Sequence, residues 1–524
     1  MEEKPIIKLF NYRPMVICAL ALVFGILVGG LFACGNYIGA LILVVLVYLI
    51  IFYLKFTSLA KLIYKHFVCV CFCLVFLVFG FSAVSVKAFL FKPYCDHQTS
   101  IVASGTIVQN GSHIVVSNLM ATYYNSNENK IMHNQKIDGE YYLYFKDDYV
   151  DSINFSIGDD VVFSGSVKFN SAINTDGEIN SAVLANNIYG NIYLSYSNIN
   201  KTGTKTKTET FDFVKNAAKK MFDANLSQES ANIAYAMVFG EKENLEGIYE
   251  DFKLSGMAHL LAVSGLHVGF FVAILTLICK LLKLKGKPRF FVIIGVLLIY
   301  AWICGFRVSV TRALIMTAAL MLSLLIGRQY DSLSSLSFAA IIILLFRPLE
   351  LFSLGFQLSF CAVLGIVLLA KPLARLFSKF LGERFGGLVS ITTSATIGTL
   401  PILITIYSRI SSLSLVANLI AVPVASAGYM SLMVFSIICA VLPFMHFLFA
   451  VPEVCFKALM YIAKITASVD RAFVEFIPDK LLILCVFLLA FSVSDFLFLS
   501  KKTKRVLAFG LLFVLLFSAG IYAF

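Results

Sequence analysis

Runs of about twenty apolar residues recur in this chain, and they constrain its fold more than any other feature of the sequence. Clear examples occupy residues 15–33, 37–54, 480–499 and 506–523. As helices, such runs cross a hydrocarbon core of about 30 Å. Charged residues make up only 14% of the chain, against about 25% in soluble proteins. The first run is not a cleaved signal peptide, because further apolar spans follow it before residue 93. The sequence therefore predicts a polytopic α-helical membrane protein.

The positions of the basic residues explain the formal net charge of +12. Lysines and arginines gather in short loops at residues 55–65, 280–289, 371–384 and 501–505. Membrane proteins retain such clusters on the cytoplasmic side. This rule places the N-terminus in the cytoplasm and residues 93–205 on the opposite side of the membrane. The excess charge is thus accounted for by topology, and it is no evidence for DNA binding.

Changes in composition along the chain predict an exported domain between two membrane parts. Within it, the segments 100–108, 141–145 and 161–169 alternate apolar and polar residues between turn signals. About five to seven short strands in such a length fit a small β-barrel, with an OB-like fold as the natural candidate. The expected domains are N-terminal spans (1–92), an exported OB-like β domain (93–205), amphipathic interfacial helices (206–252) and a transmembrane bundle (253–524).

The last two regions differ in how their helices should meet the membrane. Residues 209–225 place apolar side chains on one helical face and lysines on the other, which favours a helix lying on the membrane surface. The bundle has room for about eight crossings or half-crossings. Prolines gather between residues 411 and 470, so we expect broken or interfacial helices there.

Polar residues inside the apolar bundle are the candidate functional groups, because they are costly in hydrocarbon. The segment 257–270 carries His259, Ser264 and His267, and as one helix it would hold both histidines about 80° apart. Gly265 and Gly269 form a GxxxG pattern that predicts close helix packing. The competing interpretation is structural, with each histidine bonded to a neighbouring carbonyl.

A second polar segment, residues 305–316, carries Arg307, Ser309 and Arg312. Arg307 can reach the outer surface. Arg312 lies one to two turns deeper, where a phosphate-facing role and a structural hydrogen-bonding role are both open.

Two further segments complete the candidate path. Gln357 and Ser359 are polar residues within an apolar helix. Asn418 lies about one turn before Pro423, where a proline can break a helix that lines a cavity.

These segments resemble the signatures of the ComEC-type competence protein family. The run HLLAVSGLHVG at 259–269 is similar to the family's most specific motif, and GFRVSVTRALIM (305–316), GFQLSF (355–360) and ANLIAVP (417–423) follow in the family's order. The resemblance covers nearly the whole chain. It implies a channel that passes single-stranded DNA across the cytoplasmic membrane during natural transformation.

Two departures from the family pattern qualify what the resemblance implies. Val308 stands where the family commonly has proline, which questions the local helix geometry. Many members also end in a metallo-β-lactamase-like domain, whereas this sequence ends at Phe524 without an HxHxDH cluster. We therefore expect no catalytic residues, metal or cofactor here. The implied partners, besides DNA and lipid, are a DNA receptor, a separate nuclease and a cytoplasmic motor, since no GxxxxGK[ST] loop is present.

The predicted exported domain has a negative net charge, which disfavours tight DNA binding. Between Asp96 and Asn200 it carries eleven acidic residues against four lysines. Counterion-release binding to phosphates needs the opposite sign. A guiding or packing role over the channel mouth is the better expectation for it.

Two other functions compete with the channel. Ser264 and His267 could form the nucleophile and base of an intramembrane hydrolase, although no orienting acid is evident nearby. A solute or polymer transporter would be favoured by inverted repeats, and none is convincing in this sequence.

Overall fold

The computed structural model describes residues 13–34, 67–91, 98–204 and 212–469, with short gaps inside the last two ranges, and 473–475. The predicted spans at 37–54, 480–499 and 506–523 lie outside the described residues. The chain divides into two compact units. One holds Cys18–Phe213 and Leu344–Ser353, and the other holds Met1–Ile17, Val214–Ile343 and Leu354–Phe524.

The first unit begins with two apolar helices, α1 (Pro14–Ala33) and α4 (Phe67–Leu90). They approach closely because glycines face the neighbouring backbone. A Cβ added at Gly29 would lie 3.0 Å from the Cα of Phe81, and one at Gly80 would lie 2.6 Å from the carbonyl oxygen of Leu22. Small residues thus allow the two helices to pack backbone to backbone, as is common between apolar helices in membranes.

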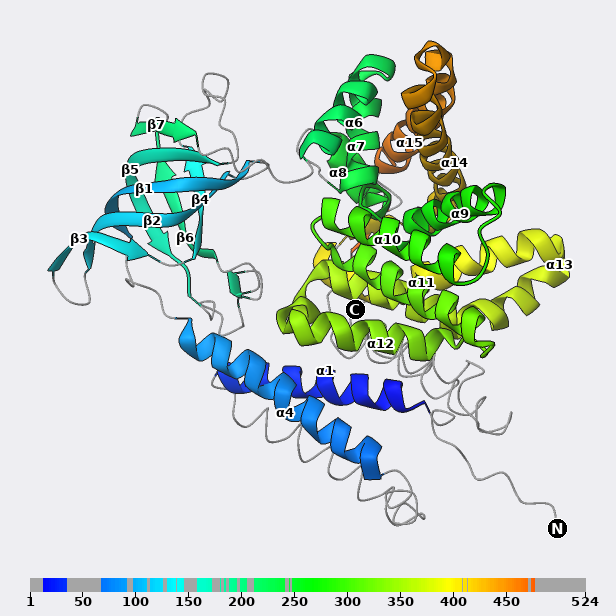
Figure 1. Cartoon of the computed structure of the whole chain (residues 1–524), viewed down its shortest axis with the longest axis horizontal. Helices are drawn as coiled ribbons and strands as arrows, with labels where there is room; N and C mark the ends of the chain where they lie inside the picture. Colours follow the sequence, from blue (N-terminus) through cyan, green and yellow to red (C-terminus); the bar gives the residue numbers. More distant parts are fainter. Residues whose placement is uncertain are drawn as a thin grey trace. The chain divides into compact units, whose positions relative to one another are not determined.

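A five-strand barrel follows in the same unit (Figure 1). Its closed circuit runs β1-β2-β4-β6-β5 and back to β1, with β3 added to β2 and β7 added to β5. The β4–β6 pair is parallel and the other pairs are antiparallel. The prediction of a small β-barrel is confirmed. The strands are β1 (Thr99–Asn110), β2 (Ile114–Asn125), β3 (Lys130–Ile137), β4 (Glu140–Phe145), β5 (Asp159–Phe169), β6 (Ile188–Leu194) and β7 (Ile199–Thr204).

Period-two burial explains why these segments form a barrel. In β6 buried and half-buried residues alternate along the whole strand, so one face lines the interior. The interior is filled by large side chains such as Ile101, Tyr141 and Phe163, each at most 1% exposed. A barrel of five strands has room for side chains only, and this core fills it.

The second unit is almost wholly helical. Its elements are α6 (Asp212–Asn225), α7 (Gln228–Phe239), α8 (Ile248–Leu254), the 3-10 helix η4 (Ala258–Leu261), α9 (Gly265–Leu281), α10 (Lys287–Ile303), α11 (Val308–Ile326), α12 (Ser332–Phe346), α13 (Leu354–Tyr407), α14 (Ser414–Val441), η6 (Pro443–Phe449) and α15 (Ala450–Ala467). A short pair of strands, β8 (Arg409–Ser411) and β9 (Phe473–Glu475), accompanies them. Another 3-10 helix, η5 (Pro348–Phe352), belongs to the first unit.

Five described helices are long and apolar enough to cross a membrane. They are α1, residues 72–89 of α4, α11, residues 354–403 of α13, and α14, while α9 and α12 are shorter apolar helices. α13 consists of two consecutive helices, because Gly382 within it has a non-helical backbone (φ 75°, ψ 165°). There the chain reverses and the two arms pack together, as the yellow segment of Figure 1 shows.

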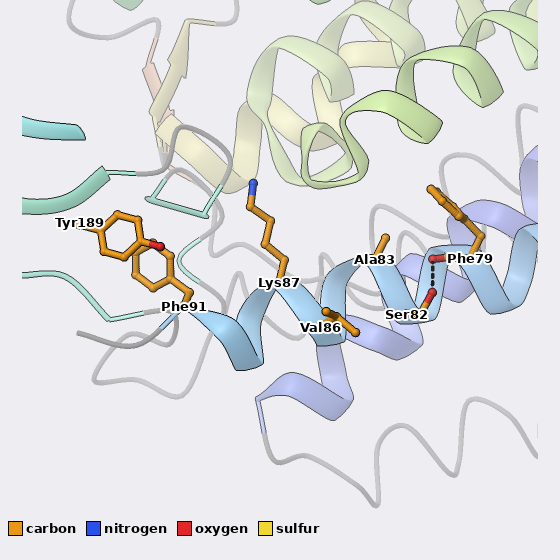
Figure 2. Close-up of a pocket in the computed structure, with 7 residues that line it drawn as sticks. All are labelled: Phe79, Ser82, Ala83, Val86, Lys87, Phe91 and Tyr189. Carbon is orange, nitrogen blue, oxygen red and sulfur yellow. Dashed lines mark hydrogen bonds between the residues drawn. The ribbon is translucent and has the colours of Figure 1, made fainter. Parts of the chain in front are cut away.

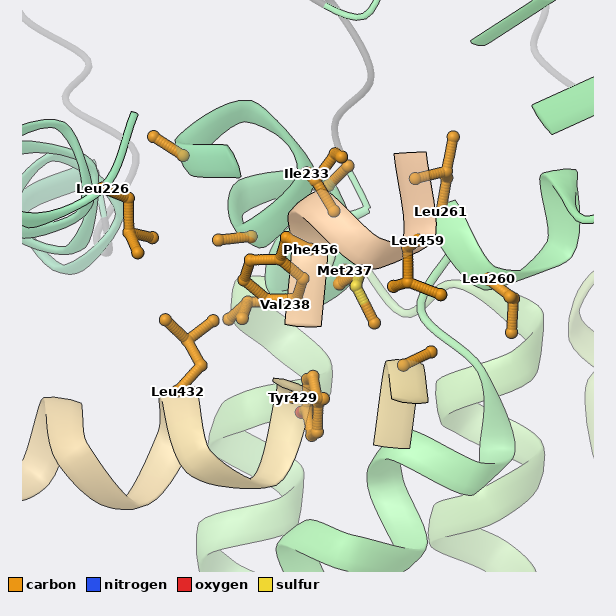
Figure 3. Close-up of a cluster of buried hydrophobic side chains, with 14 of the residues drawn as sticks. Leu226, Ile233, Met237, Val238, Leu260, Leu261, Tyr429, Leu432, Phe456 and Leu459 are labelled. Carbon is orange, nitrogen blue, oxygen red and sulfur yellow. The ribbon is translucent and has the colours of Figure 1, made fainter. Parts of the chain in front are cut away.

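α6 and α7 differ in how far their side chains are buried. α6 is amphipathic as predicted, and Phe222 near its end is buried. α7 is different: most of its side chains are buried in a cluster that includes Tyr429 and Phe456 (Figure 3). Its own glycine cap, Gly240 at φ 78°, ends the helix. α7 is therefore a core helix that holds α14 and α15 together.

The predicted break near Pro423 is not present. α14 continues through Pro423 from Ser414 to Val441. A proline removes one backbone hydrogen bond, and a helix of this length tolerates that loss within a packed bundle. Residues 450–467, within the region where we expected broken or interfacial helices, form the continuous helix α15.

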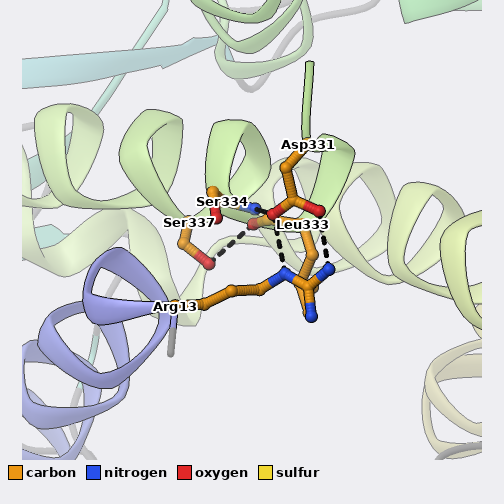
Figure 4. Close-up of polar contacts among 5 residues, drawn as sticks. All are labelled: Arg13, Asp331, Leu333, Ser334 and Ser337. Carbon is orange, nitrogen blue, oxygen red and sulfur yellow. Dashed lines mark hydrogen bonds and ion pairs between the residues drawn. The ribbon is translucent and has the colours of Figure 1, made fainter. Parts of the chain in front are cut away.

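One ion pair joins the start of the chain to the second unit's bundle (Figure 4). The guanidinium of Arg13 donates from Nε to Asp331 Oδ2 at 2.7 Å and from Nη2 to Oδ1 at 2.8 Å. Asp331 Oδ2 also accepts the N–H of Ser334 at 2.9 Å, so the same carboxylate satisfies an early backbone N–H of α12. The two-pronged geometry is the strong form of an arginine–carboxylate pair.

Candidate functional site

Ser264 and His267 cap the N-terminus of α9. The Ser264 Oγ accepts the backbone N–H of His267 at 3.2 Å, and His267 Nδ1 accepts the backbone N–H of Ser264 at 3.4 Å. This is a capping box in which histidine takes the place of the usual Glu or Gln. Such caps stabilise a helix by about 1 kcal/mol.

The capping box corrects the sequence-based geometry. The segment 257–270 is not one helix: η4 ends at Leu261, Ala262 is extended, and α9 begins at Gly265. His259 and His267 therefore do not share a helical face. His259 is exposed, whereas His267 is 1% exposed. The missed signal was the Ser-x-x-His spacing before an apolar run, which favours a helix start.

The same contacts weigh against a Ser264–His267 hydrolase. Both hydrogen bonds between these residues run to backbone N–H groups, and none described joins the hydroxyl to the imidazole. The imidazole also lies flat against the ring of Tyr429, with centroids 4.4 Å apart and planes 17° apart. A general base must reach the hydroxyl proton, and here Nδ1 accepts from the backbone instead.

Arg312 is the buried cation of the bundle. It is 5% exposed, and its Nη1 donates to the carbonyl oxygen of Ser359. Its guanidinium carbon lies 5.9 Å from the ring centroid of Phe360. Among the described residues no carboxylate pairs with it, and its Nε has no hydrogen-bond partner. Within the described part of the bundle, no carboxylate therefore neutralises this positive charge.

Gly265 is needed where α9 meets Arg312. A Cβ at Gly265 would collide with Nη2 of Arg312. The first two turns of α9, α11 and α13 thus meet at one guanidinium. The expected partner contact at Gly269 is not seen among the described atoms, because none lies within 4 Å of an added Cβ there.

Gln357 and Ser359 lie in the first two turns of α13, and both are half-buried. The Ser359 hydroxyl has no partner among the described residues, although its carbonyl holds Arg312. The rings of Phe356 and Phe360 stack beside them at 4.1 Å between centroids. This end of α13 therefore presents aromatic and polar groups together.

Asn418 positions the loop before η4. Its Nδ2 donates to the carbonyl oxygen of Gly256 at 3.4 Å, and its Oδ1 has no described partner. Gly256 itself adopts a φ of 73°, and a Cβ there would lie 2.9 Å from the Cβ of Ser414. Asn418 and Ser414, both in the first turns of α14, thus hold the chain that leads into the α9 cap.

Two predicted residues lie apart from these contacts. Arg307 is exposed and serves as the residue before α11, with its side chain against Gly240. Ser309 is half-buried in the first turn of α11. α11 begins at Val308 in spite of the missing family proline, because this first helical position needs no particular residue.

The helices that carry the polar residues form a ring of contacts. α9 packs on α11, α11 on α13, α13 on α14, and α14 returns to α9. Each contributes at least one polar residue of the candidate set, namely His267, Arg312, Ser359 and Asn418, in that order. Tyr429 and Tyr300, which the sequence did not single out, are both buried, and the Tyr300 hydroxyl donates to the carbonyl of Val238 at 2.7 Å.

A family model described as competence protein matches residues 237–518, more than half of the chain. Curated relatives include ComE operon protein 3 of Bacillus subtilis (29% identical over 38% of this chain and 25% of that protein) and Recombination protein 2 of Haemophilus influenzae (26% over 38% and 28%). An uncharacterized protein of Aquifex aeolicus is 34% identical over 37% of this chain and 45% of its own length. The matches thus span less than half of each relative. No solved structure matches the chain.

Proposed function

The chain belongs to the competence protein family, and on that premise we propose that its helical bundle conducts single-stranded DNA across the cytoplasmic membrane during natural transformation. The matched region, residues 237–518, contains every predicted path residue. The relative from Neisseria gonorrhoeae is named Competence protein ComA. The name agrees with a role in the same process.

The observation that carries the proposal is the buried guanidinium of Arg312, which no described carboxylate neutralises. A cation inside an apolar bundle is costly unless it is paired or meets a charged substrate. Arg312 is held by a carbonyl and an aromatic face, both of which leave its charge in place. An arginine fork is the group best suited to a phosphate oxygen. DNA supplies one such phosphate per nucleotide.

The ring of α9, α11, α13 and α14 supports a path through the same place. Buried polar atoms without described partners come from three of its helices: Arg312 Nε, Ser359 Oγ and Asn418 Oδ1. Such atoms are rare in packed proteins and point to water or a ligand nearby. Because His267, Arg312 and Asn418 are at most 5% exposed, we take this arrangement to be the closed state of the path.

The barrel supports an OB-like assignment. Counting only the circuit strands, their order is 1-2-3-5-4-1 with the third and fifth parallel, which fits a five-stranded Greek-key barrel of that kind. Its excess of acidic residues disfavours phosphate binding. We assign it a guiding or packing role outside the membrane.

The Arg13–Asp331 pair supports the proposed topology. Arg13 precedes α1, and Asp331 follows α11. Charge placement puts the N-terminus in the cytoplasm, and the pair then puts the end of α11 on the same side. Residues 98–204 lie outside in this topology. A DNA receptor outside, and a nuclease and a motor protein, would complete the pathway.

The test is the variant Arg312→Gln in a competent bacterium that lacks its own copy of the protein. Losing one charged hydrogen-bonding group costs about 1.5–3 kcal/mol, so we expect uptake to fall about tenfold or more. Radiolabelled DNA would be measured separately at the cell surface and in the nuclease-protected cytoplasmic fraction. Surface binding should remain.

The matched control is Arg328→Gln, which removes an exposed arginine just beyond the end of the same helix. It should leave uptake unchanged. Arg312→Lys keeps the charge and should retain more uptake than Arg312→Gln. Wild-type transformation by Arg312→Gln at equal protein level would remove this residue from the path.

A further inference from the structure

A cavity of about 410 Å³ lies at the end of α4 in the first unit (Figure 2). It is formed by the last turns of α4 and by one residue of the barrel strand β6. Its lining includes Phe79, Ala83, Val86, Lys87, Phe91 and Tyr189. Its lining residues belong to the first unit, whereas Arg312 belongs to the second, and no step of the proposed conduction uses them.

Among the described residues that line the cavity, Lys87 is the one charged group. It makes no hydrogen bond or ion pair within the described part of the chain. The other polar side chain there, Ser82, donates its hydroxyl to the carbonyl of Phe79 at 3.0 Å and is thus occupied by its own helix. The ammonium of Lys87 is therefore available to an anion that enters the cavity.

The apolar wall lies on the same helical face as Lys87. Phe79, Ala83 and Val86 are spaced four and three residues apart, so they line one stripe of α4. Phe79 and Val86 are 37% and 53% exposed. The cavity therefore joins a cation at one end to an apolar stripe that runs along the helix.

The position of Lys87 along α4 matches the edge of a membrane. It lies two residues before the end of the apolar stretch 72–89. At that level a lysine meets lipid headgroups. Phe91 and Tyr189 stack on each other just beyond it, with centroids 4.3 Å apart, as aromatic residues commonly do at the interface.

We infer that this cavity binds an anionic phospholipid, with its headgroup phosphate on Lys87 and an acyl chain along Phe79 and Val86. A zwitterionic lipid carries its own ammonium beside the phosphate, so it gains less from the lysine. A nucleic acid fits poorly, because it needs several cations and free aromatic faces. Here there is one lysine, and the aromatic rings face each other.

The experiment is native mass spectrometry of the full-length chain, delipidated in detergent and mixed with equal amounts of phosphatidylglycerol and phosphatidylcholine. We expect the chain to retain phosphatidylglycerol preferentially. Lys87→Gln should lower that preference about fivefold, which is the worth of one lysine near an anionic headgroup. Lys87→Arg should keep it.

Two further variants separate charge from shape. Ala83→Phe fills the groove while leaving the lysine, so it should reduce binding of both lipids. Lys136→Gln removes an exposed lysine of β3 in the same unit and should change nothing. Each variant must elute as the wild type does in gel filtration.

Competitors identify the source of the phosphate. Inorganic phosphate or a ten-residue oligothymidylate should not displace phosphatidylglycerol from the wild type. Displacement by phosphate would mean a simple anion site, and displacement by the oligonucleotide would assign the cavity to the DNA path. Either result, equal binding of the two lipids, or unchanged preference in Lys87→Gln would overturn the inference.

Discussion

Gly256 shows how one residue can fix the local path of the chain. Its backbone adopts a left-handed conformation, which favours glycine. A side chain at this position would also come too close to Ser414. Its carbonyl also accepts the Nδ2 of Asn418. The turn that leads into the α9 cap is therefore held against α14 by both steric fit and hydrogen bonding.

Replacing Gly256 with alanine should destabilise the protein more than the same change at Gly247. Both glycines have positive φ, 73° and 78°, so each substitution adds backbone strain of about 1–3 kcal/mol. Only Gly256 adds a steric contact, because nothing lies within 4 Å of an added Cβ at Gly247. Thermal unfolding of the detergent-solubilised chain would measure the difference.

Ser414→Gly supplies the control for that experiment, since it removes the opposing Cβ. In the double variant with Gly256→Ala, the stability lost through the steric contact should be recovered, whereas the stability lost through backbone strain should not. Equal losses for Gly256→Ala and Gly247→Ala would show that the contact with Ser414 relaxes without cost.

The polar residues of the site were predictable as a set, and their partners were not. Arg312, Ser359, His267 and Asn418 stood out because each is polar within an apolar run. Periodicity treats a segment as one regular helix, however, so it missed the extended residue Ala262 that separates His259 from His267. The stacking of the His267 imidazole on the Tyr429 ring joins residues that are 162 positions apart. A pattern within a short sequence segment cannot predict such a contact.

Among the elements, α13 is the one whose shape depends most on glycine. Its arms meet at Gly365 and Gly398, where a Cβ at Gly365 would lie 3.0 Å from the Cα of Gly398. The reversal occurs at Gly382. In hydrocarbon, helices associate through such close contacts, since apolar burial alone does not drive them together.

Gly365→Ala or Gly398→Ala should therefore separate the arms of α13. Overpacking of this kind typically costs about 1–3 kcal/mol, which would appear as a lower unfolding temperature and less protein in the membrane. Gly387→Ala is the matched control in the same element, because an added Cβ there meets nothing within 4 Å. Equal behaviour of Gly398→Ala and Gly387→Ala would contradict tight packing of the arms.

At the element level the sequence predicted the barrel better than the helices. Strands at 100–108, 141–145 and 161–169 fall inside β1, β4 and β5, because alternation with period two is directly visible. The break at Pro423 was mispredicted, since α14 packs well enough to continue through it. The GxxxG pattern at Gly265 and Gly269 drew attention, whereas the pair 365 and 398 has no local signature.

At the scale of the whole molecule, the Arg13–Asp331 pair should make stability depend on acid pH. Burial raises the pKa of Asp331, but hydrogen bonds from Arg13 and Ser334 outweigh it and hold that pKa at about 2. The unfolded value is higher, at 3.8, so the pair stabilises the fold above that pH. The contribution disappears as the pH falls through about 2.

Asp331→Asn should therefore be less stable than the wild type at neutral pH. In strong acid the difference in stability between the two should disappear. The carboxylate is partly exposed, so solvent screening limits the loss to about 1 kcal/mol. Unfolding of the variant and the wild type would be compared from pH 7 to pH 2. Glu250→Gln, which removes an exposed i,i+3 pair with Lys253, should have no comparable effect. A pH-independent difference for Asp331→Asn would exclude the carboxylate's charge as the cause.

The Arg13–Asp331 pair cannot form until late in the synthesis of the chain. Its two residues are 318 positions apart, and a bacterial ribosome adds about 5–20 residues per second. Arg13 is thus made roughly 16–64 s before Asp331 exists. For that interval the first helix must stay in the bilayer by its own hydrophobicity or with the help of an insertion factor. A partner that holds Arg13 in the nascent chain would have to release it when Asp331 emerges.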